Sequence, residues 1–210
     1  MPGATDANRS TADTAALELV RDYLVASAEV KTRSSEACAE AIVAAATLIA
    51  QSLRQGGKLL ICGNGGSAAD SQHLAGEFVS VLDRRRMRPA MAALALTTDS
   101  SIITAIGNDF GFAGIFDRQV QALGSPGDIL VGISTSGNSE NVVRAFDQAR
   151  QKRMKTIALT GGQMGILGQK ADVAICVPSE STQHIQEVHL AVEHLLCMLI
   201  ERDIFGREEK

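Results

Sequence analysis

The pattern of apolar positions along the chain changes near residue 57. Residues 14–33 and 34–57 repeat apolar side chains every three or four positions, which predicts two helices. Beyond them the apolar residues gather in five short runs that do not alternate with polar residues, so we expect strands buried on both faces. These runs span residues 58–63, 89–96, 128–134, 156–161 and 173–179.

Helical stretches separate the five runs, and a long capped one closes the chain. They span residues 67–84, 99–124, 138–153, 161–171 and 180–205. Strict alternation of strand and helix predicts an α/β fold with one parallel, doubly wound sheet of about five strands. Residues 1–13 are small, polar and aperiodic, so we expect a disordered arm before a single domain at 14–210. The first two helices are rich in alanine and poor in polar residues, which favours packing in an oligomer.

Composition excludes several classes of function. The chain has 210 residues, with 45% hydrophobic and 3% aromatic residues and a formal net charge of -4. Such a charge provides no cationic field for nucleic acid or for an anionic membrane surface. No apolar run approaches membrane-spanning length, and we see no secretion signal at the N-terminus. The four cysteines are far apart, which indicates reduced thiols in a cytoplasmic protein.

The loops that follow the predicted strands are where a parallel sheet binds its ligands. Gly63 to Ala68 satisfies the dinucleotide pattern G-x-G-x-x-A, and Asp99 is placed to serve as the acidic residue that such a site needs. The match is weak by itself, because any strand-to-helix turn that exposes its amides favours glycine. An NAD site is therefore one hypothesis for this turn.

The loop after the third predicted strand is rich in hydroxyl groups. Residues 134–139 read Ser-Thr-Ser-Gly-Asn-Ser and come directly before a helix, where free amides and hydroxyls can hold a phosphate. An ordinary serine-rich helix cap is the alternative, and several hydroxyls around one glycine favour the phosphate. A further polar loop, residues 107–112, offers Asn108 and Asp109 to sugar hydroxyls, although an Asx turn between two helices fits equally well.

A histidine and a carboxylate follow the glycine turn. His73 and Glu77 are four residues apart, so both side chains lie on one face of the helix and can bind one metal ion or one substrate. An isolated pair of this kind is more often a surface pair. The last helix carries His189, Glu193 and His194, and spacing favours His189 with Glu193 as a second metal-binding pair. Gln186 and His194 lie about 80° apart around an ideal helix.

Four ordered motifs together carry a family resemblance. "CGNGGSAADSQHLAGEF", "GNDFGF", "ISTSGNS" and "IQEVHLAVEHLL" resemble the phosphoheptose (sedoheptulose 7-phosphate) isomerases of the sugar isomerase (SIS) fold, from about residue 15 to 206. The resemblance implies a flavodoxin-like sheet, N-terminal helices that pack in a homotetramer, and sites near subunit boundaries. It also implies aldose–ketose isomerisation through an enediol, from sedoheptulose 7-phosphate to D-glycero-D-manno-heptose 7-phosphate. The product would feed ADP-heptose, lipopolysaccharide or related heptose biosynthesis.

The family's functional residues can be carried over position by position. The resemblance implies one Zn²⁺ per subunit and makes Glu77 and His194 the catalytic acid/base pair. Its metal ligands map to His73, Glu77, Gln186 and His194. Its substrate contacts map to Asn64, Gly65, Gly66, Ser67, Glu77, Asn108, Asp109, Ser134, Thr135, Ser136, Ser139 and Gln186. Asp70 matches a supporting polar position.

Two positions depart from the family pattern. Val81 stands where an arginine commonly helps to hold substrate, and Gln183 stands where some members have aspartate. Either change could alter substrate affinity or the preferred epimer. The rival hypothesis is a non-catalytic SIS protein that binds a phosphosugar or a partner, of the replication-initiation factor type. Such proteins lose the helix carboxylate and the final histidine, whereas this chain has Glu77 and His194.

Overall fold

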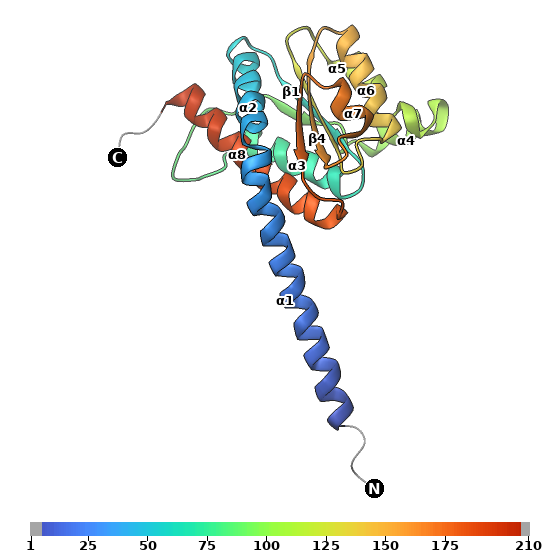
Figure 1. Cartoon of the computed structure of the whole chain (residues 1–210). Helices are drawn as coiled ribbons and strands as arrows, with labels where there is room; N and C mark the ends of the chain where they lie inside the picture. The colour runs from blue at the N-terminus through green and yellow to red at the C-terminus, as the bar shows by residue number, and fades with distance from the viewer. Residues whose placement is uncertain (1–5, 207–210) are drawn as a thin grey trace.

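The computed structural model describes the backbone of residues 6–206 and the side chains of residues 13–206. The order of elements alternates strands and helices after two N-terminal helices (Figure 1). The helices are α1 (Asp6–Ala37), α2 (Ala39–Arg54), α3 (Gly66–Val79), α4 (Ser100–Phe110), the 3-10 turn η1 (Phe112–Gly114), α5 (Asp117–Leu123), α6 (Glu140–Gln151), α7 (Gly165–Lys170) and α8 (Thr182–Phe205). The strands are β1 (Leu59–Gly63), β2 (Ala93–Ala95), β3 (Ile129–Ser134), β4 (Lys155–Gly161) and β5 (Val173–Val177).

The five strands form one parallel sheet in the order β2-β1-β3-β4-β5. This confirms the predicted doubly wound α/β fold, and the order is the flavodoxin-like one. The chain leaves β1 toward β2 on one side and returns to β3 on the other, with Gly63 paired to Ile133. The loops that follow β1 and β3 therefore begin side by side at the point where the strand order reverses. Ligands of open parallel sheets bind at such a point.

Alternate residues of each strand enter two separate apolar cores. In β1, Leu59 and Ile61 join α2, α3 and α8 on one face of the sheet, while Leu60 packs with α5, α6 and α7 on the other. Both faces are covered, which explains why the strands read as continuous apolar runs. The helices α3 and α8, which carry the candidate residues, thus lie on the same face and contact each other.

Two sequence expectations differ from the structure. The expected arm at residues 1–13 overlaps α1, because residues 6–13 are helical and no glycine or proline interrupts the chain from Asp6 to Ala37; residues 1–5 lie outside the described part. Of the expected polar loop at 107–112, the first four residues form the last turn of α4, which ends where Gly111 adopts a φ of 79°, and Phe112 begins η1. Glycine reaches this left-handed conformation without strain and so ends the helix.

The N-terminal part of α1 extends away from the rest of the molecule (Figure 1). Along it, large apolar side chains such as Leu19 (70% exposed) and Leu24 (62% exposed) face solvent in the single chain. Within the described residues no single helix is long and apolar enough to cross a membrane. The pair α1 and α2 passes that test together but is bent by 67° at the break, and α2 buries Ile42 and Ile49 in the core.

Candidate active site

The glycine turn after β1 brings the start of α3 against α8. Gly65 has a φ of 56°, which favours glycine, and it immediately precedes α3. A Cβ atom added to Gly66 would lie 2.4 Å from Nε2 of Gln186 on α8. A side chain at this position would therefore displace the Gln186 amide from the turn, whereas glycine allows their close approach.

Further along α3, His73 and Glu77 meet His194 of α8. Nε2 of His73 lies 3.3 Å from Nε2 of His194 and 3.4 Å from Oε1 of Glu77. One ligand atom from each of the three side chains lies within 4.8 Å of the other two. The imidazole rings of His73 and His194 cross at 75° with their centroids 5.0 Å apart. The i,i+4 pair on α3 is thus part of a three-residue cluster rather than an isolated surface pair.

Two of the three donor separations in the cluster match those around a tetrahedral cation. A tetrahedral zinc ion with bonds of about 2.1 Å separates its donor atoms by about 3.4 Å. The two distances at Nε2 of His73, 3.3 and 3.4 Å, agree with this value, while the separation between Glu77 and His194 is wider but within 4.8 Å. Two imidazoles and a carboxylate are also a donor set that zinc accepts. The residues present therefore fit a divalent ion such as zinc.

Two further carboxyl groups surround this cluster. Oε2 of the fully buried Glu193 lies 2.8 Å from Nδ1 of His73, on the far side of the ring from Glu77. Burial, together with the neighbouring Asp70 and Glu77, raises the pKa of Glu193 to about 9. Burial also raises the pKa of Asp70 to about 6. Oδ2 of Asp70 and Oε1 of Glu193 have no hydrogen-bond partner among the described residues. A nearby cation would stabilise the ionised form of each group.

The pKa of the His73 imidazole is lowered, first by burial and then by His194, against the opposing effect of Glu77. A neutral imidazole is the form that binds a metal ion. The lowered pKa therefore favours the neutral form of His73, which can bind a metal ion, over the protonated form, which would pair with a carboxylate.

The spacing-based choice of His189 with Glu193 as a metal pair is wrong. His189 is fully buried and its Nε2 lies 3.2 Å from the main-chain oxygen of Thr160, at the end of β4. Burial lowers the pKa of His189 to about 4. α8 is packed on several sides, so polar residues one turn apart contact different neighbours. His189 faces the sheet, while Glu193 and His194 face α3.

Other polar residues of α8 hold α1. The carboxylate of Glu187 accepts hydrogen bonds from the Tyr23 hydroxyl at 2.6 Å and from the Ser27 hydroxyl. The ring of His184 packs edge-on against Tyr23, with centroids 4.7 Å apart. His184 and Glu187 are thus polar positions of α8 that serve contacts with α1.

The hydroxyl-rich loop at residues 134–139 lies at the end of β3. Oγ of the buried Ser134 lies 2.9 Å from Oγ of Ser139, so this pair braces the loop from inside. Thr135 and Ser136 instead line a cavity of about 220 Å³. Asn138 of the same loop also lines it, and its other lining residues follow β4 and β5 or begin α8: Gly162, Gln163, Ser179, Glu180, Thr182 and Ile185. The loop thus opens toward the same helix that carries His194.

Two side chains proposed for ligand contacts have partners within the chain. The side-chain amides of Asn64 and Asn141 exchange two hydrogen bonds of 2.9 Å, which ties the glycine turn to the start of α6. Sequence reasoning missed Asn141, because its partner lies 77 positions away. Asp99, the acidic residue of the NAD hypothesis, accepts a hydrogen bond from the amide of Ile102 at 2.9 Å and caps α4. Neither contact supports a dinucleotide site.

Asn108 and Asp109 are not brought to the cluster within one chain. Both are exposed near the end of α4, where the Asn108 amide donates to the Asp109 carboxylate at 2.8 Å. α4 packs on η1 and buries none of its residues, and it lies apart from α8 (Figure 1).

Arg88 ties the end of α3 to α8, but it does not replace the arginine missing at Val81. Its side chain is 3% exposed, and its guanidinium donates to the main-chain oxygens of Glu77 and Phe78 at 2.7 and 2.9 Å. Nε of Arg88 donates to the Glu201 carboxylate at 2.6 Å. These contacts fix the position of Glu77 relative to α8, and every guanidinium nitrogen of this buried side chain donates within the chain.

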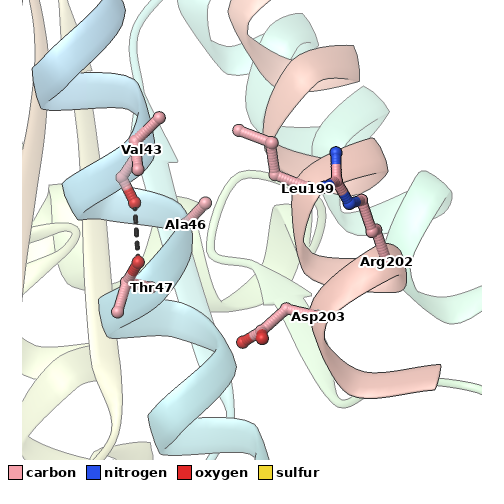
Figure 2. A pocket seen from close by; sticks show the side chains of 6 residues that line it. All are labelled: Val43, Ala46, Thr47, Leu199, Arg202 and Asp203. Carbon is pink, nitrogen blue, oxygen red and sulfur yellow. Dashed lines mark hydrogen bonds between the residues drawn. The ribbon is translucent and has the colours of Figure 1, made fainter. Parts of the chain in front are cut away.

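A cavity of about 260 Å³ between α2 and α8 lacks comparable chemistry (Figure 2). The Thr47 hydroxyl that lines it donates to the main-chain oxygen of Val43 at 2.9 Å. The carboxylate of Asp203 accepts from Arg54 at 2.9 Å. The Thr47 hydroxyl and the Asp203 carboxylate are therefore engaged in local structure, Arg202 is the remaining charged side chain among the lining residues, and the cluster on α3 and α8 remains the candidate site.

Comparison with known proteins places this architecture in a family. Residues 22–161 match the SIS domain family. The phosphoheptose isomerase of Roseiflexus sp. is 52% identical over 186 residues, which are 89% of this chain and 93% of that protein. The phosphoheptose isomerase of Aquifex aeolicus is 50% identical over 191 residues, 91% of this chain and 99% of the relative. The solved phosphoheptose isomerase from Neisseria gonorrhoeae has a TM-score of 0.83 at 45% identity and covers 88% of this chain and 98% of its own.

These relatives match nearly the whole chain, and the matched range includes the glycine turn, α3 and the loop after β3. The chain therefore belongs to the SIS domain family and, within it, to the phosphoheptose isomerases, which makes it an isomerase.

Proposed function

We propose that this enzyme interconverts sedoheptulose 7-phosphate and D-glycero-D-manno-heptose 7-phosphate through an enediol. The observation that carries the proposal is the meeting of Glu77 with His194, beside His73, from two helices far apart in the chain. Moving a proton between C1 and C2 of a sugar requires a base near both carbons and a second group that exchanges protons with the oxygens. The non-catalytic alternative is not favoured, because the chain keeps both groups and its relatives are named as isomerases.

In this proposal each group has one task in the proton transfer. The Glu77 carboxylate takes the proton from one carbon and returns it to the neighbouring carbon, while His194 exchanges a proton with the substrate oxygens. His73, Glu77, Gln186 and His194 hold a zinc ion, which when bound supplies polarisation of the carbonyl oxygen. Ser136 and Thr135 bind the phosphate in the cavity after β3, and this anchoring orients the reacting carbons.

The direct test is to incubate the purified full-length chain and zinc with sedoheptulose 7-phosphate and to follow the aldoheptose 7-phosphate. We expect product from the wild-type chain and almost none from Glu77→Gln. Gln72→Ala is the matched control, because Gln72 is exposed on the same helix beside His73. Absence of product with zinc-loaded wild-type enzyme, or full activity of Glu77→Gln, would contradict the proposal.

We also propose that the enzyme is a cytoplasmic homotetramer whose sites lie near subunit boundaries. The apolar side chains exposed along α1 and around Phe112 (63% exposed) support burial against other subunits. A groove of about 380 Å³ between α1, α2 and α8 is lined mainly by apolar side chains, including Ile42 and Leu195. In such an assembly the exposed Asn108 and Asp109 would contact the substrate of a neighbouring subunit.

Mixed assemblies test this arrangement. Asn108→Ala chains and Glu77→Gln chains should each be weakly active alone. Co-assembled in one tetramer, they should recover activity, because some sites then combine an intact Glu77 with an intact Asn108. Light scattering measures the subunit number. Full activity of Asn108→Ala, or a monomeric enzyme, would contradict shared sites.

A further inference from the structure

Glu193 is a buried carboxyl group with a single polar contact. Its side chain is fully buried on α8, and Oε2 lies 2.8 Å from Nδ1 of His73. Within the described residues Oε1 has no hydrogen-bond partner. Burying a carboxyl group with so few partners costs free energy, so its presence needs a reason other than stability.

A neighbour on the same helix shows that burial alone is not that reason. His189 lies four positions earlier on α8 and is equally buried, but its Nε2 contacts the main-chain oxygen of Thr160 in β4. His189 therefore joins two structural elements. Glu193 instead contacts the side chain of His73, whose other nitrogen faces Glu77 and His194.

We propose that Glu193 is a positioning residue that fixes the ring and the proton of His73. An imidazole that binds a cation through Nε2 must carry its proton on Nδ1, and this N–H then needs an acceptor. Oε2 of Glu193 lies at that acceptor position, 2.8 Å from Nδ1. The ring is thereby held with Nε2 directed at the cluster. This inference rests on the proposed function, because it takes His73 as a ligand of the zinc ion.

The test measures zinc affinity rather than turnover. The full-length protein is stripped of metal and titrated with zinc against a chromophoric chelator, for wild type, Glu193→Ala, Glu193→Gln and His189→Gln. We expect Glu193→Ala to weaken zinc binding about 10–100-fold, as the loss of a group that holds a metal-binding histidine typically does. Glu193→Gln keeps an acceptor oxygen near Nδ1 and should restore part of the affinity.

His189→Gln is the matched control, since it changes an equally buried polar side chain on the same helix without touching His73. It should lower the melting temperature and leave zinc affinity unchanged. The proposal is overturned if both Glu193 variants keep wild-type affinity, or if His189→Gln weakens zinc binding as much as Glu193→Ala. Should Glu193→Ala fail to fold, Glu193→Leu replaces it in the test, because leucine also removes the acceptor and fills the buried volume.

Failure of the proposed function gives a different result. If the wild-type chain binds zinc but does not isomerise sedoheptulose 7-phosphate, the proposed function is overturned, while the proposed role of Glu193 still stands. If the wild-type chain isomerises the sugar and the Glu193 variants bind zinc with wild-type affinity, only the proposed role of Glu193 is overturned. A wild-type chain that binds no zinc would overturn the inference itself.

Discussion

The two ends of the proposed site are built in different ways. The hydroxyl end is one continuous loop, residues 134–139, with neutral side chains that brace one another through Ser134 and Ser139. The cation end joins side chains 121 positions apart, His73 and His194, and surrounds them with three carboxyl groups. Neutral hydrogen-bond donors can bind the phosphate equally well in the substrate and in the transition state. Ionisable groups can transfer protons during the reaction. The comparison therefore assigns substrate affinity to one end and turnover to the other.

The largest expected effect tests the cation end. Replacing His194 with glutamine removes the acid/base group at oxygen and one proposed zinc ligand, so kcat should fall about 10²–10⁴-fold. The KM should change little, because the phosphate anchor is untouched. Steady-state kinetics with sedoheptulose 7-phosphate measure both constants, and the zinc content of the variant is determined in parallel. A large rise in KM with an unchanged kcat would reverse the assignment of the two ends.

The same contrast explains what the sequence could predict. The sheet and the hydroxyl loop rest on neighbouring residues, and the i,i+4 spacing of His73 and Glu77 is also local. The choice between His189 and His194 depends on which side of α8 faces α3. The spacing of apolar residues does not predict which side that is, because α8 buries polar residues together with apolar ones.

The family resemblance selected His194, and the structure places it beside His73. Neither line of reasoning found Glu193 as the partner of His73, or Asn141 as the partner of Asn64. Both contacts join residues distant in sequence that only the packed fold brings together. α4 has no fully buried residue, and only Ile103 and Ile106 pack partly against the core, so its sequence pattern did not show which neighbours it would contact.

A second prediction places His189 outside both ends of the site. Burial lowers its pKa from 6.5 to about 4, so in this pH range the unfolded chain binds a proton that the folded chain does not. Stability is therefore present above pH 6.5 and is lost as the pH falls toward 4. Between pH 7 and pH 5 the wild-type chain should lose about 2 kcal/mol more of its free energy of unfolding than His189→Gln.

Urea unfolding of both proteins at the two pH values measures this difference. The kcat of His189→Gln at neutral pH should equal that of the wild type, because the ring contacts β4 and not the cluster. If both proteins lost the same free energy of unfolding between pH 7 and pH 5, groups other than His189 would cause the loss of stability at acid pH. A lowered kcat would instead show that His189 belongs to the cation end.

The smallest expected effect tests the hydroxyl end. Ser136 is exposed in the cavity after β3, so Ser136→Ala removes one donor to the phosphate and keeps the 2.9 Å contact between Ser134 and Ser139. The substitution also removes the acceptor of the Asn138 amide, at 3.2 Å, so circular dichroism and the melting temperature of the variant are compared with those of the wild type. A hydrogen bond to a charged group is worth about 1.5–3 kcal/mol, which corresponds to a rise in KM of about 10–100-fold at unchanged kcat. Ser101→Ala, an exposed serine on α4, is the matched control. Sedoheptulose without its phosphate provides the sharper comparison, since it should not distinguish Ser136→Ala from wild type. If Ser136→Ala raised the KM for both sugars by the same factor, the phosphate would bind elsewhere. The assignment of substrate affinity to the hydroxyl end would then be wrong.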